Sequence, residues 1–482
     1  MTMNKTLHHR LSALALGIAA LALSACSTAP LRPAEPALPA QWQQTASPAA
    51  TQDAAHLPRW EDLADPGLVA LQQQVLAANL DLKQSALRLQ SSATALGLKD
   101  LRLTPSLSGS YSGSRPLQSS GPSYVNVGGQ QVPIPSNDRY SASWSLSAGV
   151  SWELDLWGRI AAERSAQQAE HEALRADAEA ARTALLSRAA ELWWQLGALQ
   201  ARLPLVQAQV QHAEEALPLV KARVQEGKLL PVELDRASRR LLDARNRLAD
   251  VQADRQLRLQ DLGLLLDEPR LERVAALSAS ARLPAEQQPD WTAHAVQAPV
   301  DVLGRRPDVQ RARLQVDAAL AHLKVAQASR YPSLSLSAGV GTSARSLGTL
   351  LKDPVGSVSS SLVVPLIDWR RLNLQEERQR TELDISALQL RDALAKAMVD
   401  VETRWVETAR IERQRQAQQA ALQDAVANEA QAKVRMEVGA LGRADWLQTQ
   451  DALLEARQQQ IQLQLNRWLN QAAFMKALGG SR

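Results

Sequence analysis

The sequence is poor in the residues that build enzyme sites, metal centres and disulfide frameworks. Its 482 residues contain one cysteine, Cys26, so neither an intramolecular disulfide nor a cysteine-based metal site can form. The histidines after residue 25 are scattered, without an HExxH or comparable ligand spacing, and the sequence has no P-loop. We therefore predict no catalytic residue, no metal site, no cofactor and no energy-coupling motif, and we expect the protein not to be an enzyme.

Aromatic residues and net charge are also scarce. One Phe and 4 Tyr stand beside 12 Trp, and the formal net charge is only +4. The pI of 9.3 reflects a small excess of Lys and Arg without a single basic stripe, so we do not predict a nucleic-acid partner. A hydrophobic fraction of 45% with little phenylalanine favours long helices over a large globular core.

Long hydrophobic runs are missing as well. The apolar run from Leu11 to Leu23 follows Lys5 and Arg10 and is shorter than the ~20 residues of a transmembrane helix. This pattern predicts a signal peptide over residues 1–25. It ends in Leu-Ser-Ala-Cys26, which resembles the bacterial lipobox. The resemblance implies cleavage before Cys26, covalent lipid (palmitate among the acyl chains) on that residue, and attachment to the outer membrane; the alternative is an ordinary signal peptide with a chance cysteine.

An internal repeat organises the remaining chain. Trp157, Gly227 and Leu241 recur as Trp369, Gly439 and Leu453, each pair 212 residues apart. A constant offset over this length indicates duplication. The two copies are predicted at residues 61–267 and 307–478, each with a helix, a β-hairpin and a long helical hairpin. Residues 26–60 form a tether and equatorial segment, residues 268–306 an irregular linker, and residues 479–482 a tail.

Four segments alternate apolar residues with serine or glycine, most strictly from Tyr140 to Leu156. Strict period two predicts strands with one apolar and one polar face. The half-buried sheet of a water-soluble domain gives the same pattern. Because a signal peptide precedes only four strands and no compact domain flanks them, we favour transmembrane strands, which need ~9–11 residues. We expect long external loops at 115–138 and 343–356.

Four strands cannot close a barrel, and open edges are not viable in lipid, so the membrane interpretation requires several copies. Two copies would give eight strands with a filled interior, and three would give twelve with a lumen. The sequence alone excludes a monomer but leaves the dimer open.

The long helices follow the second strand of each copy. Trp157 and Trp369 each precede their tip glycine by 70 residues, and after each glycine the apolar residues fall seven apart, which indicates coiled-coil packing. In the first copy Pro204 and Pro218 should kink or break the helix. Such hairpins would project deep into the periplasm.

These motifs together resemble the outer-membrane efflux proteins of the TolC type, and more closely their lipoprotein (NodT) branch. The resemblance is carried by the lipobox, by Trp-Glu-Leu-Asp-Leu-Trp-Gly-Arg at 152–159 and by Arg-Arg-Pro-Asp-Val at 305–309. It implies a homotrimer with a twelve-stranded transmembrane β-barrel above a long periplasmic α-helical barrel, and a mixed equatorial region. It also implies a periplasmic adaptor and an inner-membrane resistance–nodulation–division transporter as partners, and passive export of drugs or other toxic solutes.

The functional residues are predicted at the periplasmic helix tips. By alignment on the tip glycines, the resemblance assigns gating or selectivity to Glu233 and Asp445, with Arg443 as a candidate partner. Carboxylate rings in a narrow aqueous pore would favour cations. An acid at an exposed helix start needs no further function, however. The adaptor should dock on two short tip segments, which comprise Gly227, Lys228 and Leu229, and Gly439, Ala440 and Leu441.

Two other classes of protein share parts of this pattern. A periplasmic adaptor lipoprotein also has a coiled-coil hairpin, but it would have one hairpin rather than a duplicated unit of strand pair and hairpin. A purely structural envelope rod would have the helices without a channel.

Overall fold

The computed structural model describes residues 33, 42, 65–115, 123–134, 142–284, 299–365 and 367–480. Cys26 and the predicted signal peptide therefore lie outside the described residues. The chain divides into two compact units, one built from residues 1–34, 92–171 and 315–387 and the other from residues 35–91, 172–314 and 388–482. Both units draw on both halves of the sequence.

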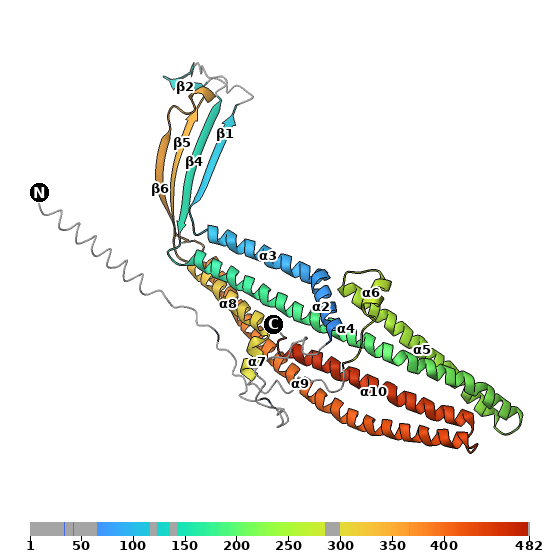
Figure 1. Cartoon of the computed structure of the whole chain (residues 1–482). Helices are drawn as coiled ribbons and strands as arrows, with labels where there is room; N and C mark the ends of the chain where they lie inside the picture. Colours follow the sequence, from blue (N-terminus) through green and yellow to red (C-terminus); the bar gives the residue numbers. More distant parts are fainter. Residues whose placement is uncertain are drawn as a thin grey trace. The chain divides into compact units, whose positions relative to one another are not determined.

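The first half of the chain contains helices, strands and a long helical hairpin in the expected order (Figure 1). Its elements are α2 (Pro66–Ala78), α3 (Leu80–Leu101), β1 (Ser106–Ser114), β2 (Ser123–Val127), β3 (Gln130–Ile134), β4 (Ser143–Leu154), α4 (Arg159–Gln225), α5 (Pro231–Leu265) and α6 (Leu271–Leu277).

The second half has the same order with shorter connections. Its elements are α7 (Pro299–Arg305), α8 (Pro307–Ala328), β5 (Ser333–Ala344), the 3-10 turn η3 (Leu347–Thr349), β6 (Val355–Val363), α9 (Trp369–Glu437) and α10 (Arg443–Ala477). The linker predicted as irregular over 268–306 thus contains α6 and α7.

One four-stranded antiparallel sheet has the order β1-β4-β5-β6. Strands β1 and β6 have 9 residues each, and β4 and β5 have 12 each, which confirms the predicted strand lengths. The register pairs residues of one face throughout, for example Ser147 with Ser110 on β1 and with Gly341 on β5. Within the described residues, the outer edges of β1 and β6 have no partner strand.

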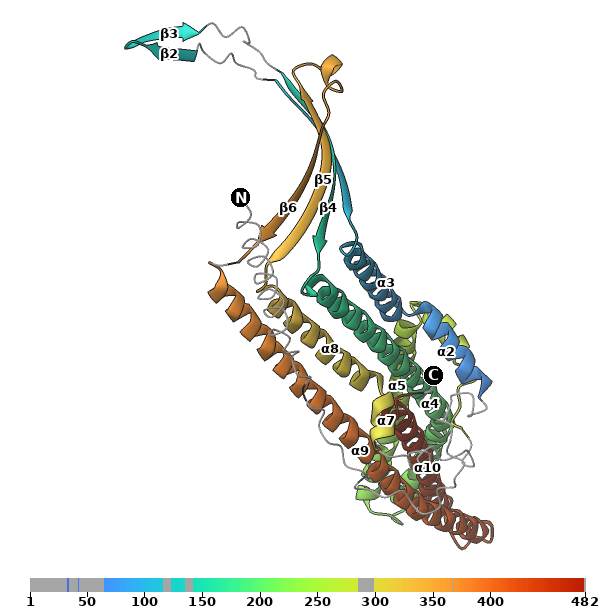
Figure 2. The same cartoon turned by 90° about the vertical axis from the view of Figure 1, so that its left-hand side faces the viewer.

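The segment 115–138 is not simply a loop, and the expectation of only four strands was wrong. Strands β2 and β3 form a separate two-stranded sheet (Figure 2). Its turn is Gly128-Gly129, both with positive φ (63° and 86°). A two-residue glycine turn between two segments that contain β-branched residues is a hairpin signal in its own right.

Helix α4 is not broken by its prolines. It runs over 67 residues with Pro204 and Pro218 inside. A proline removes one backbone hydrogen bond and crowds the preceding turn. Near Pro204, Leu199 and Val206 pack against Val251 of α5, and packing of this kind keeps the helix continuous.

The heptad positions of the second helix in each hairpin are buried or half-buried, as predicted. The buried positions are Ala237, Leu241, Ala244 and Val251 on α5, and Leu447, Leu454, Trp468 and Met475 on α10; the half-buried positions are Leu234, Leu248 and Ile461. Among the helices of the described residues, none is both long enough and apolar enough to cross a membrane.

The largest hydrophobic core lies in the second unit and is built around tryptophan. Trp193 and Trp194 of α4 and Trp468 of α10 are each at most 1% exposed, and they pack with α2, α5 and α6. Asp65 accepts a hydrogen bond from Trp193 Nε1 (3.0 Å) and also caps the start of α2. Removing one such aromatic side chain typically costs about 3–5 kcal/mol. This core therefore fixes the roots of both helical hairpins.

Candidate functional site

The motif at 152–159 forms the junction between the sheet and α4. Asp155 accepts hydrogen bonds from the backbone N–H groups of Ile160 and Ala161, so it caps the helix start. Gly158 has a φ of 71°, a conformation that disfavours a side chain. Trp157 donates to the Pro332 carbonyl (2.8 Å), which ties the second strand of one copy to the first strand of the other.

The motif at 305–309 joins α8 to the middle of α9 and to the end of α10. The Arg306 guanidinium is largely buried and donates to Asp308 (2.9 Å), Asp400 (3.2 Å) and the Ala477 carbonyl (2.8 Å). Burial acts to raise the pKa of Asp308, but hydrogen bonds from Arg306 outweigh it, so the pKa is lowered. Of the three motifs that carried the family resemblance, these two lie in the described residues, and both are structural joints.

Serine predominates on the polar face of the sheet, which also contains glycines, Glu153, Val355 and Val363. Cross-strand hydroxyl pairs link Ser110 with Ser147 (2.8 Å) and Ser112 with Ser145 (2.7 Å). We define the serine face as the residues that share this side of the sheet. They are the even-numbered residues 106–114 of β1 and the odd-numbered residues 143–153 of β4, 333–343 of β5 and 355–363 of β6.

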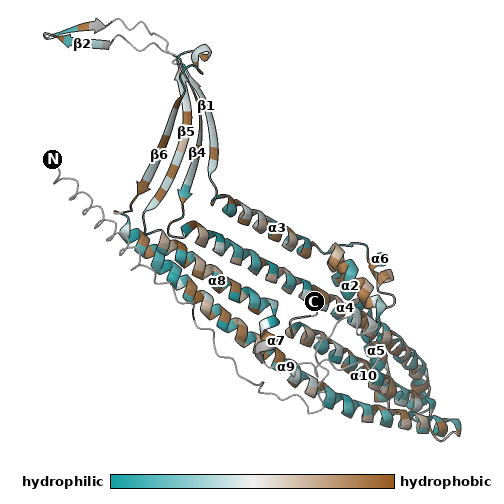
Figure 3. Cartoon of the chain, turned by 60° about the vertical axis from the view of Figure 1, so that its left-hand side comes forward, coloured by the Kyte–Doolittle hydropathy of each residue, from teal (hydrophilic) through white to brown (hydrophobic). Residues whose placement is uncertain are grey.

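The opposite face is apolar and uncovered. Leu107 on β1 is 80% exposed and Val358 on β6 is 88% exposed, although both lie in regular strands. Apolar positions recur along the strands in Figure 3, alternating with polar ones. Monomeric soluble proteins rarely expose contiguous apolar patches of this kind, which mark protein or membrane contacts.

The two helix tips have the same backbone geometry. Gly227 and Gly439 have φ of 73° and 76°. In each tip the next two backbone N–H groups donate to one carbonyl of the preceding helix, that of Arg223 or Arg435. The following helix starts four residues after the glycine in both cases. Lys228 is exposed, and Leu229 and Leu441 are half-buried.

The predicted gate residues do not form one cluster in the chain. Glu233 accepts from Arg236 on its own helix (2.5 Å). Asp445 lies 3.6 Å from Arg223 of α4, so it connects the second hairpin to the first. Within one chain Arg443 pairs with neither acid, because its guanidinium instead pairs with Glu215 of α4.

Four polar contacts connect α4 to α10 between Gln209 and the helix tips, and their α4 members were missed from the sequence. Besides Arg443–Glu215 and Arg223–Asp445, His212 pairs with Asp451 (2.8 Å) and Gln458 donates to Gln209 (3.0 Å). Gln209, His212 and Glu215 are three residues apart, so the sequence alone places these polar side chains on one side of α4. The hydrogen bond from Arg443 lowers the pKa of the exposed Glu215 carboxyl.

Gly442 is a further residue of this site that was not predicted from the sequence. A Cβ at this position would lie 2.8 Å from Asp445 Oδ2 and 3.3 Å from Arg223 Nη1. A side chain there would therefore displace one of the ion pairs that join the hairpins. Among the residues that the structure describes, no group of three or more His, Cys, Asp or Glu is arranged to hold a metal ion.

Comparison with known proteins defines the class. The model of the family "Outer membrane efflux protein" matches residues 71–267 and 298–480. The chain belongs to this family, which confirms the resemblance predicted from the sequence, and it is an efflux protein of the outer membrane.

Particular relatives extend over nearly the whole chain. The pyoverdine export outer membrane protein OpmQ of Pseudomonas putida is 29% identical over 95% of both chains. The probable efflux pump outer membrane protein TtgC of the same organism is 27% identical, with coverage of 97% of this chain and 95% of that protein. The solved MtrE outer membrane channel of Neisseria gonorrhoeae has the same fold, with a TM-score of 0.78, 23% identity and coverage of 94% and 98%. Neither an adaptor lipoprotein nor a structural rod fits these matches.

Proposed function

We propose that three copies of this chain form the outer-membrane channel of a tripartite efflux pump, and that the channel passively conducts drugs or other toxic solutes outward. A twelve-stranded transmembrane β-barrel would continue into a periplasmic barrel of long helical hairpins. The observation that carries this proposal is a four-stranded sheet with two free edges and an uncovered apolar face.

The free edges support assembly from several copies. An unpaired strand edge leaves backbone N–H and C=O groups without partners, which is untenable in lipid. Pairing β6 of one copy with β1 of the next removes every edge, since these are the two outer strands. Three copies rather than two leave a lumen wide enough for transport.

The tips support docking of a periplasmic adaptor, which would in turn connect the channel to an inner-membrane resistance–nodulation–division transporter. Leu230 is 71% exposed and Val438 is 73% exposed beside the two tip glycines. Large apolar side chains held at a rigid turn are suited to contact with another protein. The proposed docking segments remain Gly227 to Leu229 and Gly439 to Leu441, which these two side chains flank.

The contacts between α4 and α10 support a gate at the same end. Arg443–Glu215 and Arg223–Asp445 hold the second hairpin against the first. Separating these pairs would let the tips move apart and widen the pore. Glu233 and Asp445 would supply carboxylates to the passage when copies assemble.

Lipidation of Cys26 would add a second membrane attachment. The proposed site rests on the sequence, which places a signal-peptide pattern directly before this cysteine. Several acyl chains on one residue anchor a protein durably, whereas a single chain does not.

Two adjacent substitutions on β4 test the membrane orientation. Val150 belongs to the apolar face and Ser151 to the serine face. Val150→Arg should cost about 2–4 kcal/mol per chain near the bilayer centre and sharply reduce the assembled protein in outer-membrane fractions. Ser151→Arg is the matched control and should assemble normally. Equal assembly of both variants would contradict the proposed function.

A further inference from the structure

The serine face carries almost no charge. Glu153 is the only charged residue in the four strands that form the sheet. It lies near the α4 end of β4 and pairs with Arg159 at 2.7 Å, so its charge is compensated locally. Between this pair and the turns at the other end of the strands, where Asp353 lies, the serine face consists of hydroxyl groups, glycines and Val355.

The hydroxyl groups are partly satisfied within the sheet itself. Ser110 pairs with Ser147, and Ser337 with Ser359, each at 2.8 Å. Ser106 donates to the carbonyl of Ser151 (3.1 Å). Each pair uses one of its two hydroxyl protons, so the wall has fewer free donors to hold a passing solute.

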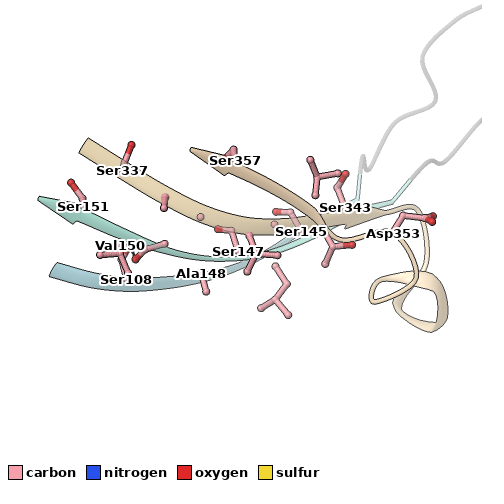
Figure 4. A pocket seen from close by; sticks show the side chains of 18 residues that line it. Ser108, Ser145, Ser147, Ala148, Val150, Ser151, Ser337, Ser343, Asp353 and Ser357 are labelled. Carbon is pink, nitrogen blue, oxygen red and sulfur yellow. Dashed lines mark hydrogen bonds between the residues drawn. The ribbon is translucent and has the colours of Figure 1, made fainter. Parts of the chain in front are cut away.

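Glycines widen the middle of this face. Gly149 on β4 lies opposite Gly339 on β5, and Gly341 lies opposite Ser147. They leave a hollow of about 600 Å³ lined mostly by serines and glycines, including Ser147, Ser151 and Ser337, and Asp353 lines it at the turn before β6 (Figure 4). The hollow is too open to enclose a ligand, and no charged side chain projects from its strands.

We infer that the serine face forms an electrically neutral, weakly retaining section of the conduit, which passes anionic, cationic and uncharged solutes alike. Selection by charge then falls to the helical section, which carries Glu233 and Asp445. Charged rings produce selectivity in narrow pores, and the strand residues between Glu153 and the turn that carries Asp353 form none. The inference rests on the proposed function, because the serine face lines a conduit only if the barrel closes.

Cysteine labelling measures the local potential directly. Ser147→Cys keeps a small side chain on the serine face, and Val150→Cys places a thiol on the apolar face. In the assembled protein, each is treated with a positively and a negatively charged methanethiosulfonate reagent of similar size. The ratio of the two rates is divided by the same ratio for a small thiol in solution, and the wild-type chain, with Cys26 alone, gives the background.

The expected ratio for Ser147→Cys is within about threefold of one, since a neutral wall concentrates neither reagent. Adding Gly341→Asp beside it is the positive control and should favour the cationic reagent by roughly tenfold. Ser337→Cys is a second site on the same face, should Ser147→Cys fail to assemble.

The two ways of failing are distinguishable. Rapid labelling of Ser147→Cys with a preference of roughly tenfold or more for the cationic reagent would overturn the neutral-wall inference and leave the channel standing. Labelling of Val150→Cys while both serine-face cysteines stay unreactive would overturn the inference and the proposed function together.

Discussion

The two helix tips have the same turn but differ in what they contact. Gly227 and Gly439 close their turns with matching backbone hydrogen bonds, and an acid occupies the third position of the next helix in both. Glu233 is satisfied by Arg236 within its own helix, whereas Asp445 and Arg443 reach α4 of the other hairpin. Duplication therefore preserved the turn. Of the two acids, only Asp445 contacts the other hairpin. We expect gating to depend on the second tip.

The largest effect is expected from reversing the charge of Arg443. Arg443→Glu replaces attraction to Glu215 by repulsion and should favour the open tip by roughly twofold to fivefold in each copy, as for other exposed pairs. Conductance in planar bilayers and uptake of a large antibiotic would both rise. Adding Glu215→Arg should restore wild-type values; failure of the double variant to recover would show that the pair does not hold the gate.

A smaller effect is expected from Gly442→Ala. The new Cβ would lie 2.8 Å from Asp445 Oδ2, so the Arg223–Asp445 pair must shift, while Arg443–Glu215 remains. Conductance should rise less than with Arg443→Glu. Gly348→Ala, where a Cβ would meet no atom within 4 Å, is the matched control. A Gly442→Ala channel identical to wild type would remove this pair from the gate.

Acid should loosen the second tip only at low pH. The hydrogen bond from Arg443 lowers the pKa of Glu215, so the attraction is complete above the ordinary glutamate pKa of about 4.3 and is lost as pH falls through the lowered value. Conductance of the wild type should stay constant from neutral pH to about 4.3 and rise below it. In Arg443→Gln this rise in conductance at low pH should be absent. If the rise persists, a group other than Glu215 causes it.

The smallest effect is expected at the first tip. Glu233→Gln removes a contact within one helix and a favourable charge at a helix start, worth about 0.3–1 kcal/mol of local stability. Conductance should change by less than about twofold, because exposed pairs contribute little. Asp445→Asn, measured in parallel, should change it more. The reverse order would mean that the first tip controls the gate.

Local patterns in the sequence predicted much of the fold. Strict alternation predicted the strands near Ser147, and the sevenfold spacing predicted the buried positions of α5 and α10. The α4 prolines were expected to kink or break the helix, but α4 is continuous. The cost of a proline is local, whereas the packing of Leu199 and Val206 against α5 stabilises the helix on both sides of Pro204. The β2–β3 hairpin was missed although Gly128-Gly129 marked its turn.

The site was less predictable than the fold. The tip glycines need positive φ, a property of their own turns, so the sequence located them. Partner choice is different, because Arg443 lies near several acids in the sequence and pairs with Glu215, 228 residues away. Which carboxylate an arginine reaches depends on how two hairpins pack, and no local pattern encodes that.

The mass of the purified mature chain tests the central claim most directly. If the uncovered apolar face meets lipid and the edges of β1 and β6 pair between copies, light scattering in detergent should give the mass of three chains. Removing the detergent should precipitate the protein. A compact single chain that stays dissolved without any detergent would contradict the account.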